Sequence, residues 1–477
     1  MYAIKEREGA VLMPVNSFEE YPMSWKPDIS NISAPLYIAI AEQLEQDIKD
    51  GKLSPGTKLP PQRELADFLD VNLSTITRAF KLCGQKGLIY ASIGSGTFVS
   101  SDAATNKILL PTSNSSHMIE MGSVLPENHA NEDITRYMKK MMNDPNFSKL
   151  FQYGRPEGNA WQTEAAMKLL EKVNFQTDQP VLLGAGGQNA IVGTLAALFQ
   201  PGDRIGTDPI TYAGIKTAAN MLGIQLVAIQ QRNGEMTREG LLYACKNEHI
   251  KGLYVIPDFH NPTTHTMSME TRKMIAVVAR QTGLIVIEDA IYSFLKEQPF
   301  APIASYAPEK VIYIASVSKT ISPGLRLSFI VTPLTLRKKI METLYNINIS
   351  VSPMMVELTA RMIHDGVAQS ILEKHRLYAK QQNSLVNQYL GDYNILGEEE
   401  CMFRWLILPE KFTGVQFELL ASKAGVQVYA AERFAVGNVK PINAVRLAIT
   451  APENQLEQAL IILKDLLESD GDYSFVD

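Results

Sequence analysis

One lysine of this chain lies among hydroxyl groups and shortly before an arginine. Lys319 follows Ser316 and Ser318, and Arg326 comes seven residues after it. A lysine amine can form an imine with an aldehyde, and an arginine fork beside hydroxyl groups can bind a phosphate. Most lysines in polar loops are surface residues, so this chemistry requires matching groups elsewhere in the chain.

Two residues of one segment could bind the ring of a cofactor. Asp289 ends an apolar run that begins at Leu284, and a carboxylate held there could keep a pyridine nitrogen protonated. A helix cap is an equally good interpretation of this aspartate on its own. Tyr292 lies three residues further on, on the same side of a helical turn, where its hydroxyl could donate to the 3′ oxygen of the ring.

Two more segments supply a ring-stacking group and an amide. Tyr212 closes the sequence Asp-Pro-Ile-Thr-Tyr and could stack on the ring, and Asn261, before a proline, could reach the 3′ oxygen. An imine-forming lysine, a ring acid, a stacking aromatic and an anion cup are what pyridoxal 5′-phosphate requires of a protein. The residues therefore predict this cofactor, held on Lys319.

A glycine-rich turn could complete the anion cup. Gly186, Gly187 and Gln188 precede a helix expected over 190–198. Free N–H groups and a partial positive charge at a helix N-terminus favour a phosphate. Such a turn is weak evidence for a phosphate site on its own. The order in which all these segments follow one another along the chain is stronger evidence for the cofactor.

Bringing these residues together requires strands that end side by side. Apolar runs at 181–183, 252–257, 283–289, 311–314 and 327–331 alternate with helical stretches. This alternation predicts a doubly wound α/β sheet. From about residue 345 onward, helices precede a few strands, which indicates a smaller α+β domain.

The N-terminal part has a different pattern. Apolar positions predict helices from Leu36 to about Gly51, over 62–69, and from a capping Ser74 to about Lys86. Two short strands with the glycine-containing tip Gly94-Ser95-Gly96 follow as a hairpin. Three helices and a hairpin, over 34–100, predict a winged helix-turn-helix of the α+β class.

This module could bind double-stranded DNA. A recognition helix reads base edges from its N-terminal turns while short polar side chains contact phosphates. The candidate DNA-binding residues are Arg63, Ser74, Thr75, Thr77, Arg78 and, at the wing, Gly94, Ser95 and Gly96. The alternative is a three-helix packing module with an exposed hairpin.

Composition limits the remaining possibilities. The net charge of −6 is unusual for a DNA-binding protein, but residues 71–100 carry Arg78, Lys81 and Lys86 and no acidic residue. Three widely spaced cysteines predict neither a disulfide nor a metal site. No apolar run reaches the ~20 residues of a membrane span. A cytoplasmic protein that makes no membrane contact is expected, starting at Met1 or at Met23.

The N-terminal module resembles the GntR family of bacterial regulators. The matching stretches are 35–37, 51–56, 59–66 and 94–99. The resemblance implies a winged helix-turn-helix that binds operator DNA. Leu73 departs from the family pattern, which often has Arg or Ser there, so a DNA contact usually made at this position is not expected.

The remaining residues resemble the fold-type I aminotransferases, and the two together resemble the MocR-type subfamily of the GntR regulators. The resemblance implies that Lys319 carries the internal aldimine and that Asp289 binds the ring nitrogen, with Ser316, Ser318 and Arg326 on the phosphate. It implies further that Tyr153 reaches the phosphate of a neighbouring subunit in a homodimer and that Arg446 clamps a substrate or effector carboxylate. For Arg446, an exposed strand face is the alternative. Thr264 and Ser328 replace family glycines and are expected to alter local backbone geometry.

The predicted organisation is an extension at 1–33, the DNA-binding domain at 34–100, a Ser-, Thr- and Asn-rich linker at 101–118 and the aminotransferase-like domain at 119–477. Its large part covers about 150–345 and its small part about 346–470. The first hypothesis is a transcription regulator that senses a small amino compound through an external aldimine at Lys319. The alternatives are a working aminotransferase and a regulator that senses pyridoxal phosphate itself. Whether the protein is an enzyme stays open, as do its effector, its operator and the sign of its regulation.

Overall fold

The chain forms two compact units, Met1–Ala104 and Thr105–Asp477, each with its own hydrophobic core. The computed structural model describes residues 23–28, 35–50, 52–53, 56–86, 88–92, 96–100, 118–126 and 129–469. Most of the expected extension and linker, together with Gly94 and Ser95 of the expected wing tip, lie outside the described residues.

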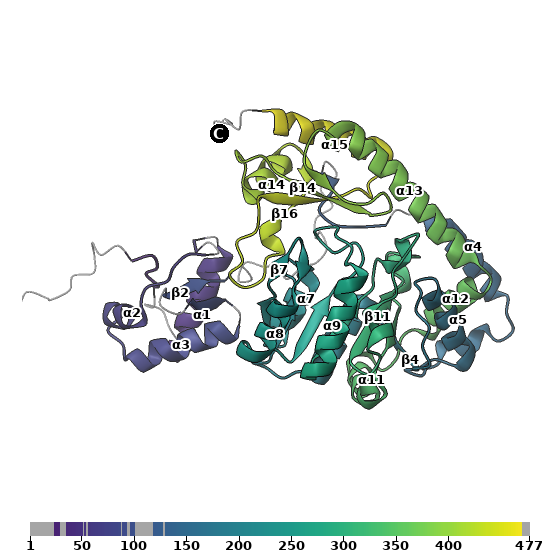
Figure 1. Ribbon diagram of the computed structural model, residues 1–477, viewed down its shortest axis with the longest axis horizontal. Coiled ribbons are helices and arrows are strands. Elements are labelled where there is room, and N and C mark those ends of the chain that lie inside the picture. The colour runs from purple at the N-terminus through teal and green to yellow at the C-terminus, as the bar shows by residue number, and fades with distance from the viewer. Residues whose placement is uncertain are drawn as a thin grey trace, which may run out of the picture. The chain divides into compact units, whose positions relative to one another are not determined.

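The described residues of the first unit form three helices and a hairpin, whose arrangement can be followed in Figure 1. The helices are α1 (Leu36–Lys49), α2 (Gln62–Phe68) and α3 (Leu73–Gln85), and the antiparallel strands are β1 (Ile89–Ser92) and β2 (Gly96–Val99). The predicted cap of the third helix was two residues late. The side chain of Asn72, not Ser74, is the cap, and it accepts a hydrogen bond from the backbone N–H of Ser74 at 2.8 Å.

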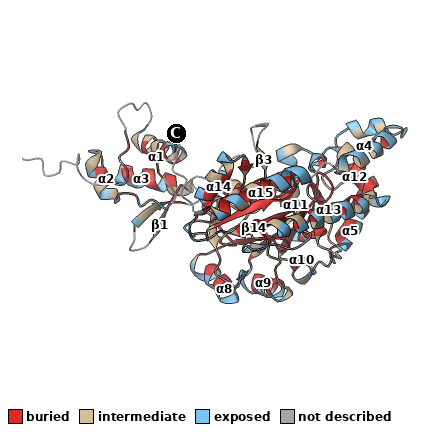
Figure 2. Ribbon diagram, turned by 90° about the horizontal axis from the view of Figure 1, so that it is seen from above, coloured by how far each residue is buried: buried red, intermediate tan, exposed pale blue. Residues whose placement is uncertain are grey.

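The core of this unit follows the helical spacing of its apolar residues. Ile40, Leu44 and Ile48 of α1 are buried, as are Ile76 and Phe80 of α3, and Figure 2 shows the buried stripes on both helices. This spacing places one apolar face of each helix against the other and leaves the opposite faces polar.

A short segment before α1 packs into the same core. Trp25 is buried, and its indole Nε1 donates to Asp47 Oδ2 at 2.9 Å. The indole needs a partner because a buried N–H without one is costly. Residues 23–28 therefore contribute to the folding of the first unit.

A seven-stranded sheet forms the centre of the second unit. Its strand order is β4-β12-β11-β10-β9-β5-β6. The strands are β4 (Val181–Gly184), β5 (Arg204–Thr207), β6 (Gln225–Ala228), β9 (Gly252–Val255), β10 (Ile285–Asp289), β11 (Val311–Ser316) and β12 (Ser328–Val331). β12 is antiparallel to both neighbours, and the other pairs are parallel. The prediction of an α/β fold is confirmed, with a sheet that is mixed.

Helices cover this sheet, as its fully buried central strands require. One group consists of α6 (Gly187–Leu198), α7 (Ala213–Met221) and α11 (Leu334–Asn348), in which α6 packs against both others. A second group consists of α8 (Arg238–Asn247), α9 (Met269–Thr282) and α10 (Ile303–Tyr306). Outside the sheet, α4 (His129–Met142), α5 (Ala160–Glu171) and α12 (Pro353–His364) form a further helical layer.

The last part of the chain forms a smaller layer with its own core. Its sheet has the order β13-β14-β17-β16, from β13 (Ile395–Leu396), β14 (Phe403–Ile407), β16 (Tyr429–Ala430) and β17 (Ala444–Ala448). The helices α13 (Val367–Leu390), α14 (Gly414–Lys423) and α15 (Glu453–Glu468) accompany it. The first strand of the second unit, β3 (Ile119–Glu120), pairs with β15 (Val426–Gln427) of this layer.

Among the helices that the structure describes, none is both long enough and apolar enough to cross a membrane.

Candidate functional site

The phosphate cup predicted from the sequence comes together at one end of the central sheet. Ser316 ends β11, and its hydroxyl donates to Ser318 Oγ at 3.1 Å. Arg326 donates to Ser318 Oγ at 3.4 Å and to the carbonyl of Ala185 at 3.2 Å. The hydroxyls of Ser316 and Ser318 and the guanidinium of Arg326 therefore lie together beside the start of α6, and these are donors that could bind an anion.

Two glycines allow these groups to approach the start of α6. Gly186 has φ +92°, and a Cβ there would lie 2.3 Å from Arg326 Nη2. A Cβ on Gly187 would lie 3.3 Å from the Cβ of Ser316. Glycine at 186 is thus required both by the backbone conformation and by the guanidinium packed on it. The donors present fit a phosphate group.

Lys319 lies just beyond β11 in the same cluster. Burial lowers the pKa of its amine to about 8, and the positive charges of Arg446 and Arg326 act in the same direction. Its Nζ donates to the backbone carbonyl of Val124. A lysine with a pKa near neutrality is partly uncharged and can act as a nucleophile or base.

Asp289 ends β10, as the sequence suggested, and it is almost fully buried. Its Oδ2 accepts from the hydroxyl of Tyr254 at 2.7 Å, and burial raises its pKa to about 6. The backbone N–H of Ile291 donates to its Oδ1 at 3.3 Å. Tyr254, on β9, is a contact that sequence reasoning missed, because a tyrosine within an apolar strand reads as core.

Arg446 and Asn261 are joined directly. Arg446 Nη1 donates to Asn261 Oδ1 at 2.6 Å. Three rings surround the guanidinium, with their centroids 4.9 Å (Phe434), 5.5 Å (Tyr429) and 5.9 Å (Phe403) from its Cζ. Burial lowers the pKa of Arg446. The alternative interpretation, an arginine on an exposed strand face, is wrong, because Arg446 is 5% exposed.

The two predicted tyrosines and the glutamine lie in the same neighbourhood. Tyr212 and Gln188 both approach Gly214, where a Cβ would lie 2.2 Å from Tyr212 Cε1 and 2.5 Å from Gln188 Oε1. That Gln188 oxygen is buried and has no hydrogen-bond partner among the described residues. Burial raises the pKa of Tyr212 to about 12 and that of Tyr292 still further. Both hydroxyls therefore stay protonated and can donate.

A backbone strap, residues 118–126, contacts both cations of the site, and sequence reasoning did not foresee it. Gly122 offers its carbonyl to Arg446, and Val124 offers its carbonyl to Lys319. Glu120 Oε1 accepts from the N–H groups of Gly122 and Ser123 at 2.7 and 2.6 Å, which fixes the turn between them. Backbone carbonyls carry no sequence signature, so no motif could have revealed these contacts.

Tyr153 does not join this cluster within one chain. Its side chain is 83% exposed, in the segment after the short helix η2 (Phe147–Phe151). Contact with the phosphate of a neighbouring subunit, the role that the sequence predicts for Tyr153, is compatible with this exposure and stays a prediction.

The two departures from the family pattern have visible consequences. Thr264 has φ +65°, a left-handed conformation that is unfavourable for a β-branched residue. Ser328 lies opposite Gly184 in the β12–β4 pair. Its buried hydroxyl has no hydrogen-bond partner among the described residues. Neither change removes a group from the cluster around Lys319.

The candidate DNA-binding residues lie on the polar face of α3. Ser74, Thr77 and Arg78 are exposed and Thr75 is half-buried, while Arg63 is exposed on α2. Leu73, at the first position of α3, is 39% exposed and donates nothing to a phosphate. This face is free to contact a partner because Ile76 and Phe80 anchor the opposite one.

A further cation of the first unit, Lys58, lies beside the hairpin. Gly96 has φ +119°, and a Cβ there would lie 2.9 Å from Lys58 Cε. Lys58 is exposed and forms a bridge with Phe98 of β2. Lys58 lies in a turn far from the wing along the chain, so its sequence position does not reveal this neighbourhood.

The described residues contain no cluster of three or more His, Cys, Asp or Glu side chains that could hold a metal ion. Cys83, Cys245 and Cys401 are all free thiols.

Two family models match the chain, one for each unit. The model for class I and II aminotransferases matches residues 116–463, and the model for bacterial regulatory proteins of the gntR family matches residues 36–99.

Several relatives have both regions. The chain is 52% identical over 459 residues to an uncharacterized HTH-type transcriptional regulator, YdeF of Bacillus subtilis. This alignment covers 96% of this chain and 99% of the relative. It is 25% identical over 418 residues to the vitamin B6 salvage pathway transcriptional repressor PtsJ of Salmonella typhimurium. This second alignment covers 86% of this chain and 93% of the relative.

Solved aminotransferases share the fold of the second unit. Kynurenine aminotransferase from Pyrococcus horikoshii aligns with a TM-score of 0.68 at 23% identity, over 74% of this chain and 93% of that one. An archaeal alanine:glyoxylate aminotransferase aligns with a TM-score of 0.69 at 20% identity, over 81% and 98%.

Proposed function

This chain belongs to the MocR-type regulators of the GntR family, and from this premise we propose that it is a cytoplasmic, DNA-binding transcription regulator. Its second unit would bind pyridoxal 5′-phosphate and sense a small amino compound. The observation that carries this proposal is the joint presence, in one chain, of an exposed polar face on α3 and a half-buried lysine with a lowered pKa.

The residues around Lys319 fit the cofactor. Gly186, Gly187 and Arg326, with Ser316 and Ser318, supply donors for its phosphate. Asp289 offers a buried carboxylate to the ring nitrogen, and Tyr212, Tyr292 and Asn261 would contact the ring and its 3′ oxygen. When bound, the cofactor supplies an aldehyde that exchanges between amines and a ring that withdraws electrons. These residue roles are proposals that rest on the geometry above.

The chain's own groups would control access of the amino compound. Lys319, with its pKa lowered to about 8, can give up a proton near neutral pH and take one back. Arg446, enclosed by three aromatic rings, would bind a carboxylate of the incoming compound through its guanidinium fork. An effector that lacks a carboxylate would leave this cation with Asn261 and the carbonyl of Gly122 as its partners.

The strap suggests how occupancy could reach the DNA-binding unit. A ligand on Arg446 or a bond at Lys319 competes with the carbonyls of Gly122 and Val124. The strap directly follows the predicted linker. A ligand can shift the protein only through unequal affinity for two arrangements. In one arrangement the strap carbonyls are the partners of Arg446 and Lys319, and in the other the ligand takes their place.

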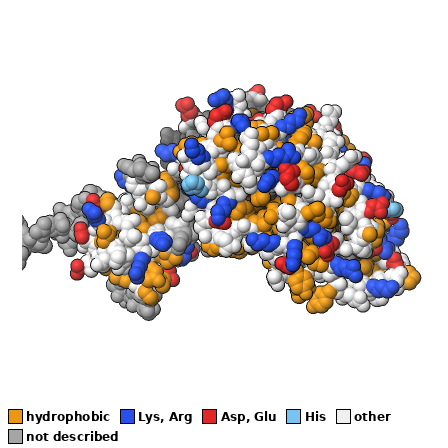
Figure 3. All heavy atoms as spheres, turned by 60° about the horizontal axis from the view of Figure 1, so that its bottom comes forward, with side chains coloured by type: hydrophobic (Ala, Val, Ile, Leu, Met, Phe, Trp, Pro, Cys, Tyr) orange, Lys and Arg blue, Asp and Glu red, His pale blue; other side chains and the backbone are white. Residues whose placement is uncertain are grey.

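A homodimer is part of the proposal. The space-filling view shows hydrophobic side chains exposed between the charged ones on one face of the second unit (Figure 3). Phe151 is 71% exposed and Tyr153 is 83% exposed, which is unusual for large aromatic residues close together in a single chain. Burial against a second copy would explain their exposure and would bring Tyr153 to a neighbouring site.

One observation favours a second candidate function, a working aminotransferase. The lowered pKa of Lys319 and the raised pKa of Asp289 are shifts typical of catalytic sites. Turnover of an amino donor and a keto acceptor at about 1–1000 per second would favour the enzyme. Much slower turnover, together with sequence-specific DNA binding, would favour the regulator.

Two experiments test the proposal. Borohydride reduction of the cofactor-loaded protein, followed by peptide mapping, is expected to locate the cofactor on Lys319 and on no other lysine. Gel retardation is expected to show binding to the DNA upstream of its own gene that an excess of unrelated DNA does not remove. A reduced cofactor on a different lysine would contradict the site, and equal competition by unrelated DNA would contradict the regulator.

A further inference from the structure

A second cavity of about 430 Å³ lies beside the Lys319 site in the second unit. None of the residues proposed to bind the cofactor lines it. Its walls come from the loop after β5, the hairpin β7 (Gln231–Arg232) to β8 (Glu235–Met236), the loop after β9, the strands β13 and β14, and the segment 439–442 before β17. Its size and position, at the carboxyl ends of parallel strands, are typical of small-molecule sites.

The cavity and the Lys319 site share the face of the small sheet but lie under different strands. Trp405 of β14 is paired in register with Arg446 of β17, so both side chains lie on the same face. Trp405 lines the cavity, whereas Arg446 donates to Asn261. Phe434 packs against both, with its ring centroid 6.5 Å from that of Trp405 and 4.9 Å from the Arg446 guanidinium.

Most of the cavity wall is apolar. Ile210, Met236, Ile256, Met267, Trp405 and Ile407 line its interior. Leu396 and Ile442 also line it and are 46% and 53% exposed. Such partly exposed apolar side chains at a cavity favour a ligand with an apolar body.

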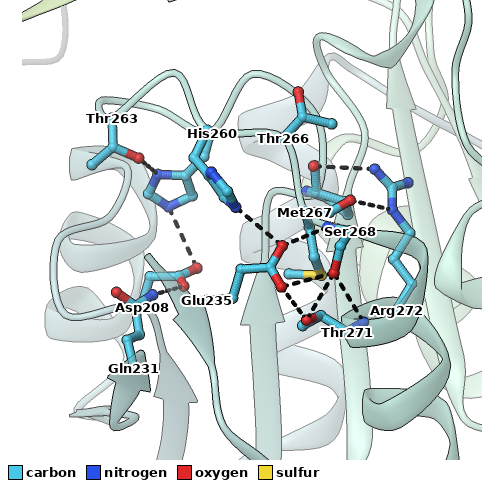
Figure 4. Close-up of polar contacts among 12 residues, drawn as sticks. Asp208, Gln231, Glu235, His260, Thr263, Thr266, Met267, Ser268, Thr271 and Arg272 are labelled. Atoms are coloured by element: carbon cyan, nitrogen blue, oxygen red, sulfur yellow. Dashed lines mark hydrogen bonds and ion pairs between the residues drawn. The ribbon is translucent and has the colours of Figure 1, made fainter. Parts of the chain in front are cut away.

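A small polar group marks one end of the cavity (Figure 4). Asp208 is 6% exposed, and its Oδ1 accepts from Gln231 Nε2 at 2.6 Å. His260 lies beside it, with its Nδ1 hydrogen-bonded to Thr263 Oγ1 at 2.8 Å. Its Nε2 lies 3.4 Å from Asp208 Oδ2 and has no hydrogen-bond partner among the described residues. A carboxylate has about four acceptor sites, so Asp208 keeps capacity for a donor from a ligand.

A second carboxylate in the same wall is saturated. Glu235 accepts from the N–H and the hydroxyl of Ser268 at 2.6 and 2.7 Å, from Thr271, and from His265 Nε2 at 3.1 Å. These hydrogen bonds outweigh burial and lower the pKa of Glu235 to about 2. Its charge is thus present at physiological pH, but its oxygens are already used.

We propose that this cavity is a second binding site, for a small organic cation with an apolar or aromatic body. The cationic head would lie against Asp208, and the body would pack on Trp405 and the aliphatic side chains around it. The two carboxylates make this wall negative, and Trp405 can attract a cation through the face of its ring. Lys440 also lines the cavity and carries a positive charge. It is exposed, however, and it is not part of the polar group at Asp208.

The position of the cavity links it to the proposed function without depending on it. His260 directly precedes Asn261, and Asp208 belongs to the segment that carries Tyr212. The backbone of this segment is bonded to the small layer, from Thr211 N–H to the Phe434 carbonyl at 2.9 Å. A ligand here would therefore contact elements that position the Lys319 site while leaving Lys319 itself free.

The probe must not react with the cofactor, so a quaternary ammonium ion is the right choice. Benzyltrimethylammonium has an aromatic body and a permanent positive charge, and it cannot form an imine. Calorimetric titration of the full chain with this ion is expected to show one site per chain. The matched anion 3-phenylpropanoate is expected to bind at least tenfold more weakly.

Variants separate the cavity from the Lys319 site. Asp208→Asn keeps the shape of the side chain and removes its charge, and it is expected to weaken binding of the ammonium ion at least tenfold. Asp392→Asn, at an exposed aspartate outside the cavity, is the matched control and should bind like the parent. Ile442→Trp should block the partly exposed wall and abolish binding while Asp208 stays in place. Lys319→Ala should bind the ammonium ion as the parent does.

Several results would overturn this proposal. They are the absence of binding to the parent, equal or tighter binding of 3-phenylpropanoate, or undiminished binding in both Asp208→Asn and Ile442→Trp. Loss of ammonium binding in Lys319→Ala would show that the ion occupies the Lys319 site instead. None of these results bears on whether the protein binds pyridoxal phosphate or DNA, so failure here is distinguishable from failure of the proposed function.

Discussion

The polar face of α3 and the cluster around Lys319 are built in opposite ways. Ser74, Thr77 and Arg78 are exposed, on a helix whose other face is anchored in the core. Asp289 and Arg446 are 2% and 5% exposed, and burial shifts the pKa of each. The polar face of α3 keeps its charged groups in water, whereas the cluster around Lys319 buries them.

The difference reflects what each surface would bind. A DNA backbone is a long polyanion, and exposed donors are enough to meet it, with an affinity that falls as salt rises. Imine chemistry needs an amine that loses its proton near neutral pH, and burial shifts the pKa of Lys319 in that direction. Substitutions on α3 should therefore act locally, while substitutions near Lys319 should also change stability and pH dependence.

The largest expected effect tests the close packing of the buried cluster. Gly186→Ala should lower the affinity for pyridoxal phosphate about 100-fold, because the new Cβ displaces Arg326 and the residue must keep a positive φ. Equilibrium dialysis measures this. Gly202→Ala is the control, since Gly202 has φ +90° with nothing within 4 Å of a Cβ. Equal affinities in the two variants would contradict the described cup.

Asp289 should make stability depend on pH. Its pKa is raised from an ordinary 3.8 to about 6, so the folded protein binds more protons between these values. The stability that Asp289 contributes is therefore present below about pH 4 and is lost as the pH rises to 6, by about 3 kcal/mol at most. Urea unfolding of the cofactor-free protein and of Asp289→Asn across this range should show the loss in the parent alone. Parallel pH profiles would contradict the burial of this carboxyl.

On the exposed surface, Arg78→Ala should weaken DNA binding by about 10- to 100-fold and leave cofactor affinity unchanged. The slope of log affinity against log salt should also become shallower if Arg78 contacts a phosphate. Fluorescence anisotropy on an upstream DNA fragment measures both. Arg136→Ala is the matched control, at an exposed arginine of α4 in the second unit. A similar loss in the control would mean that general charge, not α3, accounts for the binding.

The smallest expected effect concerns a buried hydroxyl. Ser328→Ala should leave the protein as stable or up to about 1 kcal/mol more stable, because the Ser328 hydroxyl has no partner among the described residues. Ser316→Ala should not make the protein more stable, because this variant loses the hydrogen bond to Ser318. Thermal unfolding of both variants measures the difference, and a clear destabilisation by Ser328→Ala would mean that its hydroxyl is satisfied.

Residue types and order were enough to predict both folds and to bring together most of the cluster. The apolar runs became the buried strands β9, β10 and β11, and the polar residues at their ends met at one edge. Tyr254 was missed because a polar atom inside an apolar strand has no pattern of its own. The strap was missed because Gly122 and Val124 act through backbone carbonyls, and only the tertiary structure shows where these point.

The cavity at Asp208 was equally invisible in the sequence. Its wall joins six separate segments between residues 208 and 442, and no two of its polar groups form a motif. Asp208 and His260 were read only as neighbours of Tyr212 and Asn261. The pairing of Trp405 with Arg446 in register, which depends on strand order, creates the second site beside the first.

The most direct test of the central claim is a DNase I footprint on the protein's own upstream DNA. The parent and Lys319→Ala are each compared with and without pyridoxal phosphate. We predict a defined protected region for both proteins, a pattern that changes with the cofactor for the parent, and no change for Lys319→Ala. Absence of protection for the parent, or the same response from both proteins, would contradict a regulator that works through Lys319.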